Sequence, residues 1–396
     1  MVLNINKRNK VLESMAKLIK LEQSSILEAN RKDLDAYKGD DLAMGDRLKV
    51  DQSKIDGMIL SLNQLAGQED PLEVERFAFT HDNGMQISNK TAPFGTVMII
   101  YESRPDVTIE AAGIAFKSGN KILLKGGKES LHSNLVLVEL WHQALSNSEC
   151  SKDWVHYLEY NREQTQAFLE HPTQKVDLIV PRGGEKLIAF VKQHATCPVI
   201  VSGRGNNFLY VGMEADLQMA LDLILNGKTT KISACNALDK VLIAADMPRK
   251  QEFIHHLILE LKKRKVQIYT DQALSSIEGT SPIESDAIWL EEFLDYKIVL
   301  GQVASMEEAI DKINTYGGGH SAVIVTEHAA NASTFMNSVD AAAVYHNAST
   351  RFTDGGQFGL GGELAISTDK LHQRGPIGLQ HLVTNKWYVK GNGQTR

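Results

Sequence analysis

Short apolar runs alternate with segments of helical periodicity from residue 95 onward, and this alternation constrains the fold more than any other feature. The first series predicts strands at 95–101, 121–125, 155–158, 176–180, 199–201 and 208–211. Helices are predicted between them at 107–118, 129–145, 163–170 and 185–194. Strands this apolar, separated by helices, indicate a parallel sheet covered on both faces. A second series begins at residue 240, so we predict two α/β units.

The segments that flank this alternation have different periods. Residues 2–68 are predicted to be helical, with turn signals at Lys38-Gly39-Asp40 and Asp56-Gly57 that are expected to separate packed helices. Residues 75–90 predict two strands around Asn83-Gly84, a pair favoured in tight hairpin turns. The last strand-like stretch is 381–390. A hairpin outside the main sheet has an exposed edge, so we expect it to pair with another element or subunit.

Composition excludes several classes of protein. A chain of 396 residues with a net charge of -7 and a pI near 6.0 does not have the basic surface of a nucleic-acid-binding protein. No apolar run approaches the roughly 20 residues of a membrane span, and the amphipathic first segment is not a signal peptide. Three cysteines cannot form a disulfide framework, so a cytoplasmic, reducing location is expected.

Cys235 is the candidate for nucleophilic chemistry. It lies in NGKTTKISACNAL (226–238), where Lys228 and Lys231 are expected to favour its thiolate form. Cys150 follows a polar loop and Cys197 precedes Pro198, so both are interpreted as structural. A lone cysteine is more often a small buried hydrophobic residue, and spacing alone does not exclude that alternative.

Two glycine-rich turns that join a strand to a helix are candidates for binding an anion. They contain Lys125, Gly126, Gly127 and Lys128 in the first turn, and Arg182, Gly183 and Gly184 in the second. Backbone amides and cations converge at such turns, although an ordinary connection is the alternative. Two of them at one sheet edge favour a nucleotide. The stretch 203–208 has only half of a dinucleotide fingerprint, and no histidine or cysteine pair has the spacing of a metal site.

Several longer strings resemble the γ-glutamyl phosphate reductase (glutamate-5-semialdehyde dehydrogenase) family of the aldehyde dehydrogenase superfamily. They occur in the family's order over nearly the whole chain. The strings are YESRPDV (101–107), VDLIVPRGG (176–184), KTTKISACNAL (228–238), YGGGHS (316–321), NASTRFTDGGQFGLGGELAIST (347–368) and RGPIGLQ (374–380), together with ILLKGGKES and His132-Ser133-Asn134.

The resemblance implies an aldehyde-dehydrogenase-like α/β fold with two doubly wound domains and a small β oligomerisation element. An NADP-binding domain is expected at 1–226, including the hairpin 75–90. A catalytic domain is expected at 227–346, and 347–396 returns to the cofactor domain and ends in an oligomerisation strand.

The implied reaction is the NADPH-dependent reduction of L-glutamate 5-phosphate to L-glutamate 5-semialdehyde and phosphate through a cysteine thioester. This is the second step of proline biosynthesis from glutamate. The resemblance also implies a homo-oligomer and a separate glutamate 5-kinase, from which the substrate could be channelled. The alternative is a superfamily relative that oxidises another small aldehyde with NAD(P). A hydrolytic cysteine enzyme and a non-catalytic scaffold are the rival classes.

The resemblance assigns roles to individual residues. It makes Cys235 and Asn236 catalytic, the two glycine-rich turns cofactor-binding, and Ser103, Arg104 and Arg351 substrate-binding. No metal is implied. Lys128 stands where NAD-preferring relatives have a glutamate, which predicts a preference for NADPH.

The chain departs from the family pattern at three places. The family usually has Cys-His at Asn207-Phe208, Gln-Arg-Pro at Thr230-Lys231-Ile232, and an acidic residue at Ala322. These departures leave the family's helper roles at those positions open.

Overall fold

The computed structural model describes residues 2–39 and 42–396, so the predicted turn at Asp40 lies outside the described residues. The chain divides into two compact units. Unit 1 comprises Met1–Ser202, Gly359–Ala365 and Ile377–Arg396, and unit 2 comprises Gly203–Phe358 and Ile366–Pro376. The first boundary therefore falls after Ser202 and not at 226, because β7 (Asn207–Val211) pairs with strands of the second sheet. For the same reason unit 2 extends past 346, since the turn at 349–354 packs on its strands.

The described residues up to Gly67 are mostly helical, as predicted, but a single helix, Gln52–Gly67, runs through the turn predicted at Asp56-Gly57. The helices are α1 (Ile5–Leu21), α2 (Gln23–Ala36), α3 (Leu42–Leu48) and α4 (Gln52–Gly67). Asn4 caps α1 by accepting the backbone N–H of Lys7 at 2.9 Å, and Asp51 caps α4 in the same way. Leu12, Met15 and Ile19 recur at helical spacing and are fully buried in the core.

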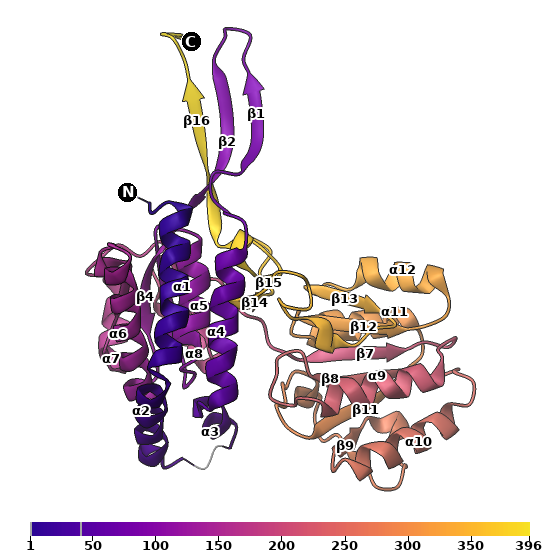
Figure 1. Cartoon of the computed structure of the whole chain (residues 1–396). Helices are drawn as coiled ribbons and strands as arrows, with labels where there is room; N and C mark the ends of the chain where they lie inside the picture. Colours follow the sequence, from indigo (N-terminus) through magenta and orange to yellow (C-terminus); the bar gives the residue numbers. More distant parts are fainter. Residues whose placement is uncertain (1, 40–41) are drawn as a thin grey trace. The chain divides into compact units, whose positions relative to one another are not determined.

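A four-stranded parallel sheet in the order β5-β4-β3-β6 forms the centre of unit 1 (Figure 1). Its strands are β3 (Thr96–Tyr101), β4 (Lys121–Lys125), β5 (Val155–Tyr157) and β6 (Leu178–Arg182). The connecting helices are α5 (Val107–Lys117), α6 (Leu131–Asn147), α7 (Arg162–Glu170) and α8 (Glu185–His194). Alternate residues of β3 face two different cores, because Val97 belongs to the α1, α4, α5 and α6 side and Met98 to the α7 and α8 side. The predicted strand at 199–201 is reduced to a single bridge between Val199 and Ile179.

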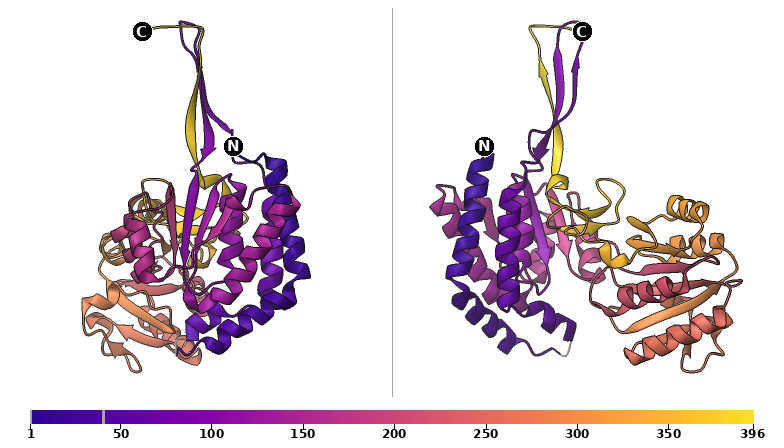
Figure 2. Two further views of the ribbon diagram at one scale, coloured as in Figure 1. Left: turned by 90° about the vertical axis from the view of Figure 1, so that its left-hand side faces the viewer. Right: turned by 45° about the vertical axis from the view of Figure 1, so that its right-hand side comes forward.

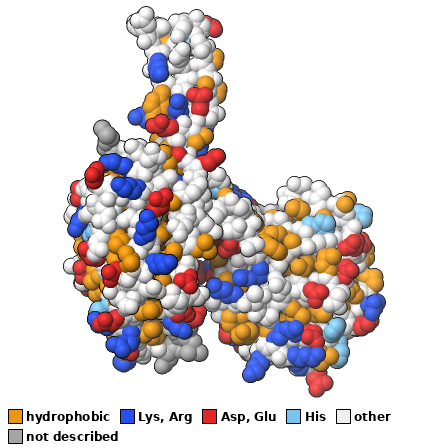
Figure 3. Space-filling view, viewed as in Figure 1, with side chains coloured by type: hydrophobic (Ala, Val, Ile, Leu, Met, Phe, Trp, Pro, Cys, Tyr) orange, Lys and Arg blue, Asp and Glu red, His pale blue; other side chains and the backbone are white. Residues whose placement is uncertain are grey.

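A three-stranded antiparallel sheet, here called the arm, continues beyond the helices of unit 1 (Figure 2). It consists of β1 (Glu75–Thr80), β2 (Gln86–Pro93) and β16 (Val383–Lys390). The predicted hairpin is confirmed, with Gly84 at the turn adopting a φ of 87°. Within the chain the hairpin pairs with another element, because β2 is hydrogen-bonded to β16. Association with another subunit stays a prediction. Figure 3 shows hydrophobic side chains on the surface of the arm.

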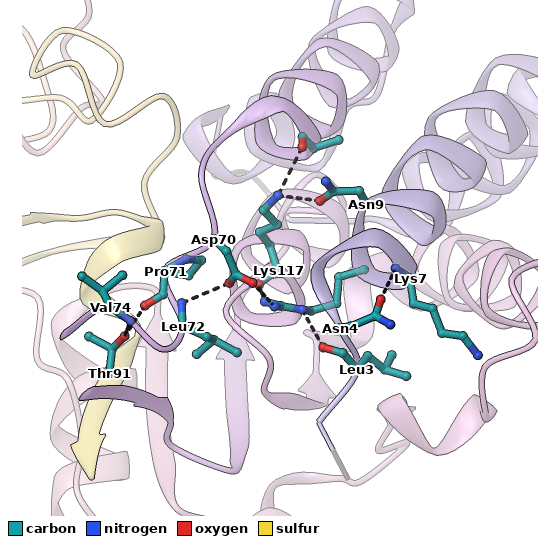
Figure 4. A network of polar contacts seen from close by, with 12 residues as sticks. Leu3, Asn4, Lys7, Asn9, Asp70, Pro71, Leu72, Val74, Thr91 and Lys117 are labelled. Carbon is teal, nitrogen blue, oxygen red and sulfur yellow. Dashed lines mark hydrogen bonds and ion pairs between the residues drawn. The ribbon is translucent and has the colours of Figure 1, made fainter. Parts of the chain in front are cut away.

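A buried polar network ties the base of the arm to the helices (Figure 4). The Arg8 guanidinium donates to the Asp70 carboxylate at 2.6 Å and to the backbone carbonyl of Lys117. The Lys117 ammonium donates to Asn9. On the arm side, the Thr91 hydroxyl donates to the Pro71 carbonyl at 2.7 Å. The segment between α4 and β1 is therefore held from both α1 and β2.

Unit 2 is built on a seven-stranded parallel sheet in the order β10-β9-β11-β8-β7-β12-β13. Its remaining strands are β8 (Leu238–Ala244), β9 (Gln267–Thr270), β10 (Ser281–Pro282), β11 (Lys297–Val303), β12 (Ser321–Val325) and β13 (Ala343–His346). Its helices are α9 (Leu217–Thr229), α10 (Lys250–Lys263), α11 (Met306–Tyr316) and α12 (Ala329–Ser338). The predicted second α/β unit is confirmed, and its strands β7, β8 and β12 are wholly buried.

Short elements complete the chain. A two-stranded sheet consists of β14 (Ala365–Ser367) and β15 (Gly375–Ile377). The 3₁₀ turns are η1 (Lys128–Ser130), η2 (Lys152–Trp154), η3 (Gln272–Leu274), η4 (Asp286–Trp289), η5 (Thr350–Phe352) and η6 (Leu379–His381). Among the described residues, no helix combines the length and the apolar character needed to cross a membrane.

Candidate active site

The predicted site residues form two groups, one in each unit. In unit 1 they follow the ends of β3, β4 and β6, which meet at one edge of the sheet because these strands are parallel. In unit 2 they lie on the segment 230–237, here called the nucleophile loop, and on the turn at 349–354.

Cys235 lies half-exposed in the nucleophile loop, between the end of α9 and the start of β8. Its carbonyl oxygen accepts a hydrogen bond from Asn207 Nδ2 at 2.8 Å. The backbone of Gly205 lies directly against Cys235, where a Cβ atom would overlap the Cys235 carbonyl. The loop is thus packed main chain to main chain against the segment that leads into β7.

The side chain of Asn236 holds the neighbouring turn. Its Nδ2 donates to the carbonyls of Arg351 at 3.2 Å and Thr353 at 3.0 Å. In return, the Thr350 hydroxyl donates to the Asn236 carbonyl at 2.7 Å. These contacts hold η5, with Arg351, beside the nucleophile loop.

The Arg351 guanidinium has hydrogen-bond donors without an acceptor among the described residues. Among the described residues, its buried Nε and Nη1 atoms have no hydrogen-bond partner. Burial lowers the pKa of Arg351, and an ionised Cys235 opposes that change, so the two groups are close enough to attract each other. Orphaned guanidinium donors beside a cysteine suit an oxyanion such as a carboxylate or phosphate.

Lys228 does not act on Cys235 as the sequence suggested. Its ammonium is fully buried and pairs with the Asp239 carboxylate at 2.8 Å, and Asp239 also accepts the backbone N–H of Phe293 at 2.9 Å. Burial lowers the pKa of Lys228, while Asp239 raises it. The pair joins the end of α9 to the start of β8 and so closes the base of the nucleophile loop. Lys231 is exposed.

A chain of buried hydroxyl groups supports the turn at 349–354. His320 Nδ1 lies 2.8 Å from the Ser321 hydroxyl, which lies 2.7 Å from that of Thr353. Thr353 in turn contacts the Tyr345 hydroxyl at 2.7 Å. Burial lowers the pKa of His320 to about 4, so its ring is neutral at pH 7.

The first glycine-rich turn of unit 1 is tightly packed. Lys125 Nζ donates to the Gly126 carbonyl at 2.7 Å, and burial lowers the pKa of this lysine. Gly126 has no room for a side chain, because a Cβ atom would lie 2.9 Å from the Tyr157 hydroxyl. A Cβ atom at Gly127 would lie 3.3 Å from the backbone nitrogen of Ser103. Lys128, at the start of η1, is exposed.

Two carboxylates of unit 1 accept backbone amides near the glycine-rich turns. The Asp33 carboxylate accepts the backbone N–H groups of His132 and Ser133 at the start of α6, at 3.0 and 2.8 Å. At the second turn, the Glu102 carboxylate accepts the N–H of Gly184 at 3.1 Å, directly before α8. At Gly183 a Cβ atom would lie 2.5 Å from Glu102 Cδ, so only glycine leaves room there.

Ser103 and Arg104 follow β3 in the same edge. The Ser103 hydroxyl is buried and lies 3.4 Å from Glu129 Oε2. Arg104 Nη2 donates to the Asp106 carboxylate at 2.8 Å. Burial and the charge of Asp106 raise the pKa of Glu110 to about 7. The Asp106 carboxylate therefore balances part of the Arg104 charge within unit 1.

The sequence of this chain is similar to those of known proteins. Residues 3–276 match the aldehyde dehydrogenase family model. The γ-glutamyl phosphate reductase 2 of Bacillus licheniformis is 40% identical over 392 residues, covering 98% of this chain and 92% of that protein. The γ-glutamyl phosphate reductase of Clostridium perfringens is 41% identical, covering 98% and 94%.

Solved structures agree with the sequence comparisons. The crystal structure of γ-glutamyl phosphate reductase from Thermotoga maritima has a TM-score of 0.94 at 37% identity and covers 100% of this chain and 95% of that one. An engineered glycolyl-CoA reductase with bound NADP+ has a TM-score of 0.70 at 18% identity, covers 98% and 92%, and shares the fold. The chain belongs to the aldehyde dehydrogenase family and, within it, to the γ-glutamyl phosphate reductases.

Three residues that shape the site were not selected from the sequence: Asn207, Asp33 and Glu102. Asn207 did carry a signal, because it departs from the family pattern directly before a predicted strand. Asp33 and Glu102 carried none, since each acts on an amide far away in the sequence.

Proposed function

We propose that this chain reduces L-glutamate 5-phosphate to L-glutamate 5-semialdehyde and phosphate with NADPH, the second step of proline synthesis. The relatives named γ-glutamyl phosphate reductase support this reaction. The observation that carries the proposal is Arg351, whose buried, unpaired donors lie beside Cys235 among the described residues. A cytoplasmic location and transfer of substrate from a separate glutamate 5-kinase belong to the same proposal.

Cys235 is the proposed nucleophile. Its thiolate attacks the γ-carbonyl carbon, and the bond from that carbon to the phosphate oxygen breaks. Phosphate leaves with the bonding electron pair, and a γ-glutamyl thioester stays on Cys235. A hydride, which carries two electrons, then adds to the thioester carbon, and the carbon–sulfur bond breaks to release the aldehyde and return the Cys235 thiolate.

Arg351 is proposed to bind the phosphate of the substrate. Because its guanidinium attracts an ionised Cys235, it stands near the carbon that carries the phosphate. It would favour the thiolate before attack and the phosphate as its charge increases on departure. The backbone N–H of Cys235 and a side chain from the 101–104 segment are the candidates for stabilising the oxyanion.

The sheet edge of unit 1 that follows β3, β4 and β6 suits a dinucleotide. Gly126 and Gly183 leave no space for a side chain, and Lys125 and Lys128 supply positive charge. We assign the cofactor to these residues together with Gly127, Arg182 and Gly184. When bound, NADPH supplies the hydride. A phosphate at Gly184 requires Glu102 to release that amide.

The reverse reaction tests the proposal most directly. Absorbance at 340 nm should rise with NADP, glutamate 5-semialdehyde and phosphate, and should not rise when phosphate is omitted. An aldehyde oxidiser would turn over without phosphate, and a hydrolase would produce no NADPH. Either result contradicts the proposed function.

Substitution of the cysteines tests which thiol reacts. Cys235→Ala should abolish the reaction while cofactor binding and the folded state remain. Cys150→Ser and Cys197→Ser should retain most activity, because both cysteines belong to unit 1, whereas the nucleophile loop belongs to unit 2. Loss of activity in either control, with activity left in Cys235→Ala, would show that the wrong thiol was assigned.

A further inference from the structure

Asn207 places the two N–H groups of its side-chain amide among three carbonyl oxygens, which share them. Its Nδ2 lies 2.8 Å from the Cys235 carbonyl, 2.6 Å from the Ala237 carbonyl and 3.0 Å from the Gly205 carbonyl. The residue is fully buried at the start of β7. Two of the three acceptors, the carbonyls of Cys235 and Ala237, belong to the nucleophile loop. Most of the hydrogen bonding of Asn207 is therefore to this loop.

The orientation of this amide follows from its partners. Three carbonyl oxygens can accept hydrogen bonds from an NH₂ group but would repel an oxygen atom placed there. No other side-chain group of this size offers two N–H donors at one atom without a charge. The Asn207 side chain is therefore matched to the carbonyls that it contacts.

The contacts fix the main chain on both sides of Asn236. Asn207 holds the carbonyls of Cys235 and Ala237 from β7, while Thr350 holds the carbonyl of Asn236 from η5. Three consecutive carbonyl groups thus have a defined partner. Because the main chain sets the direction of the Cα–Cβ bond of Cys235, it limits the sulfur to the few staggered positions around that bond.

We infer that Asn207 is a positioning residue for Cys235, holding the nucleophile loop so that the sulfur faces Arg351 and the reacting carbonyl. The inference deepens the proposed function and rests on it only for the identity of the nucleophile. It also gives a role to a position at which this chain differs from the family pattern.

A purely structural role is the alternative, and Asn206 provides the matched control. Asn206 is equally buried, and its Nδ2 donates to the carbonyls of Trp289 at 2.6 Å and Tyr316 at 2.8 Å. Neither acceptor lies in the nucleophile loop. Asn206→Ala should therefore cost a similar amount of stability without displacing Cys235.

The first experiment compares steady-state constants of the full chain. For Asn207→Ala we expect kcat to fall by about 10- to 100-fold with little change in KM, because misplacing a reacting group by about 1 Å has effects of this size. Asn206→Ala should keep kcat within about threefold, since it leaves the reacting groups in place. Asn207→Ser keeps one donor and should recover part of the loss.

The second experiment measures Cys235 without substrate, in a Cys150→Ser, Cys197→Ser background. The pH midpoint of iodoacetamide alkylation should move to higher pH in Asn207→Ala, because the sulfur is no longer held beside the Arg351 guanidinium. It should stay unchanged in Asn206→Ala. If Asn207→Ala does not fold, Asn207→Ser answers the same question.

The results separate the two proposals. Parental kcat and alkylation midpoint in both Asn207 variants would overturn the positioning role, as would equal losses in Asn206→Ala. A parent protein without phosphate-dependent turnover would overturn the proposed function but leave the alkylation comparison valid.

Discussion

A Cβ atom on Gly205 would lie 2.5 Å from the Cα atom of Cys235, a separation that no folded backbone accepts. The obstacle is main chain and not the end of a flexible side chain. Gly205 is therefore needed for close approach, and the same approach lets Asn207 reach the Cys235 carbonyl.

Gly205→Ala should push the nucleophile loop away from β7. We expect kcat to fall by at least about tenfold, as for other displacements of a reacting group. Overpacking should also lower the free energy of unfolding by about 1–3 kcal/mol. Turnover and urea unfolding of the same sample measure both effects.

Gly57→Ala is the control for this substitution. Gly57 lies inside α4, and nothing stands within 4 Å of a Cβ atom there. Alanine should raise the free energy of unfolding by about 0.5–1 kcal/mol and leave kcat unchanged. Equal loss of activity in both variants would remove the steric argument for Gly205.

The sequence predicted the elements well because their signals are local. The burial of β3 on both faces and the helix α1 follow from the continuous apolar run and from the helical spacing of apolar residues. The domain boundary was misplaced because membership of a sheet depends on pairing. Nothing local says that β7 pairs with β8 and β12 rather than with the first sheet.

In the candidate site, too, local sequence signals predicted some features, while contacts between distant segments could not be predicted. Cys235 and Arg351 were identified from strings, and the structure brings them together. Lys228 was expected near Cys235 because it is close in sequence, but a buried cation needs a partner and Asp239 supplies it. Hydrogen bonds between distant segments, such as that from Asn207 to Ala237, cannot be predicted from the residues around either partner.

Arg351 gives a prediction that separates binding from chemistry. In the reverse direction, Arg351→Met should raise the KM for phosphate by about 10- to 100-fold, because a charged hydrogen bond is lost. Arg351→Lys should lose less, since it keeps the charge but not the two-pronged geometry. Arg264→Met, at the exposed end of α10, removes the same charge as a control. An unchanged KM in Arg351→Met would place the phosphate elsewhere.

Lys117 gives a prediction about pH (Figure 4). Burial, reinforced by the charge of Arg8, lowers the pKa of Lys117 from 10.5 to about 8. Between these two values the unfolded chain holds a proton that the folded chain has released, so the free energy of unfolding rises with pH. Below about pH 8 both states are protonated and the slope disappears.

Lys117→Met should remove this rise. Between pH 8 and 10.5 the wild type should gain on the order of 1–3 kcal/mol relative to the variant, the linkage expected for such a shift. The lost hydrogen bonds to Asn9 and Ala66 add a constant offset and no slope. Urea unfolding at several pH values measures the difference, and parallel profiles would contradict the role of Lys117.

The arm gives a prediction about assembly. Phe77 and Trp387 lie on one face of it, 5.9 Å apart between ring centres, and are 50% and 55% exposed. Exposed aromatic side chains on a sheet with two free edges favour association. We expect at least a dimer at micromolar concentration, weakened by Trp387→Lys together with Phe77→Lys. Tyr388→Lys, on the opposite face, is the control. Sedimentation of the wild type as a monomer would contradict this prediction.

Cofactor choice is predicted to depend on Lys128. Its ammonium is exposed at the start of η1, whereas Lys125 donates to the Gly126 carbonyl. An ammonium attracts the ribose 2′-phosphate that distinguishes NADPH from NADH, and a partly exposed pair of charges gains on the order of 1 kcal/mol or more. Lys128→Glu replaces attraction by repulsion, so the ratio of kcat/KM for NADPH over NADH should fall by at least about tenfold. Lys121→Glu, at the other end of β4, makes the same change in net charge and should leave the ratio unaltered. A ratio that is unchanged in Lys128→Glu would mean that Lys125 alone recognises the ribose.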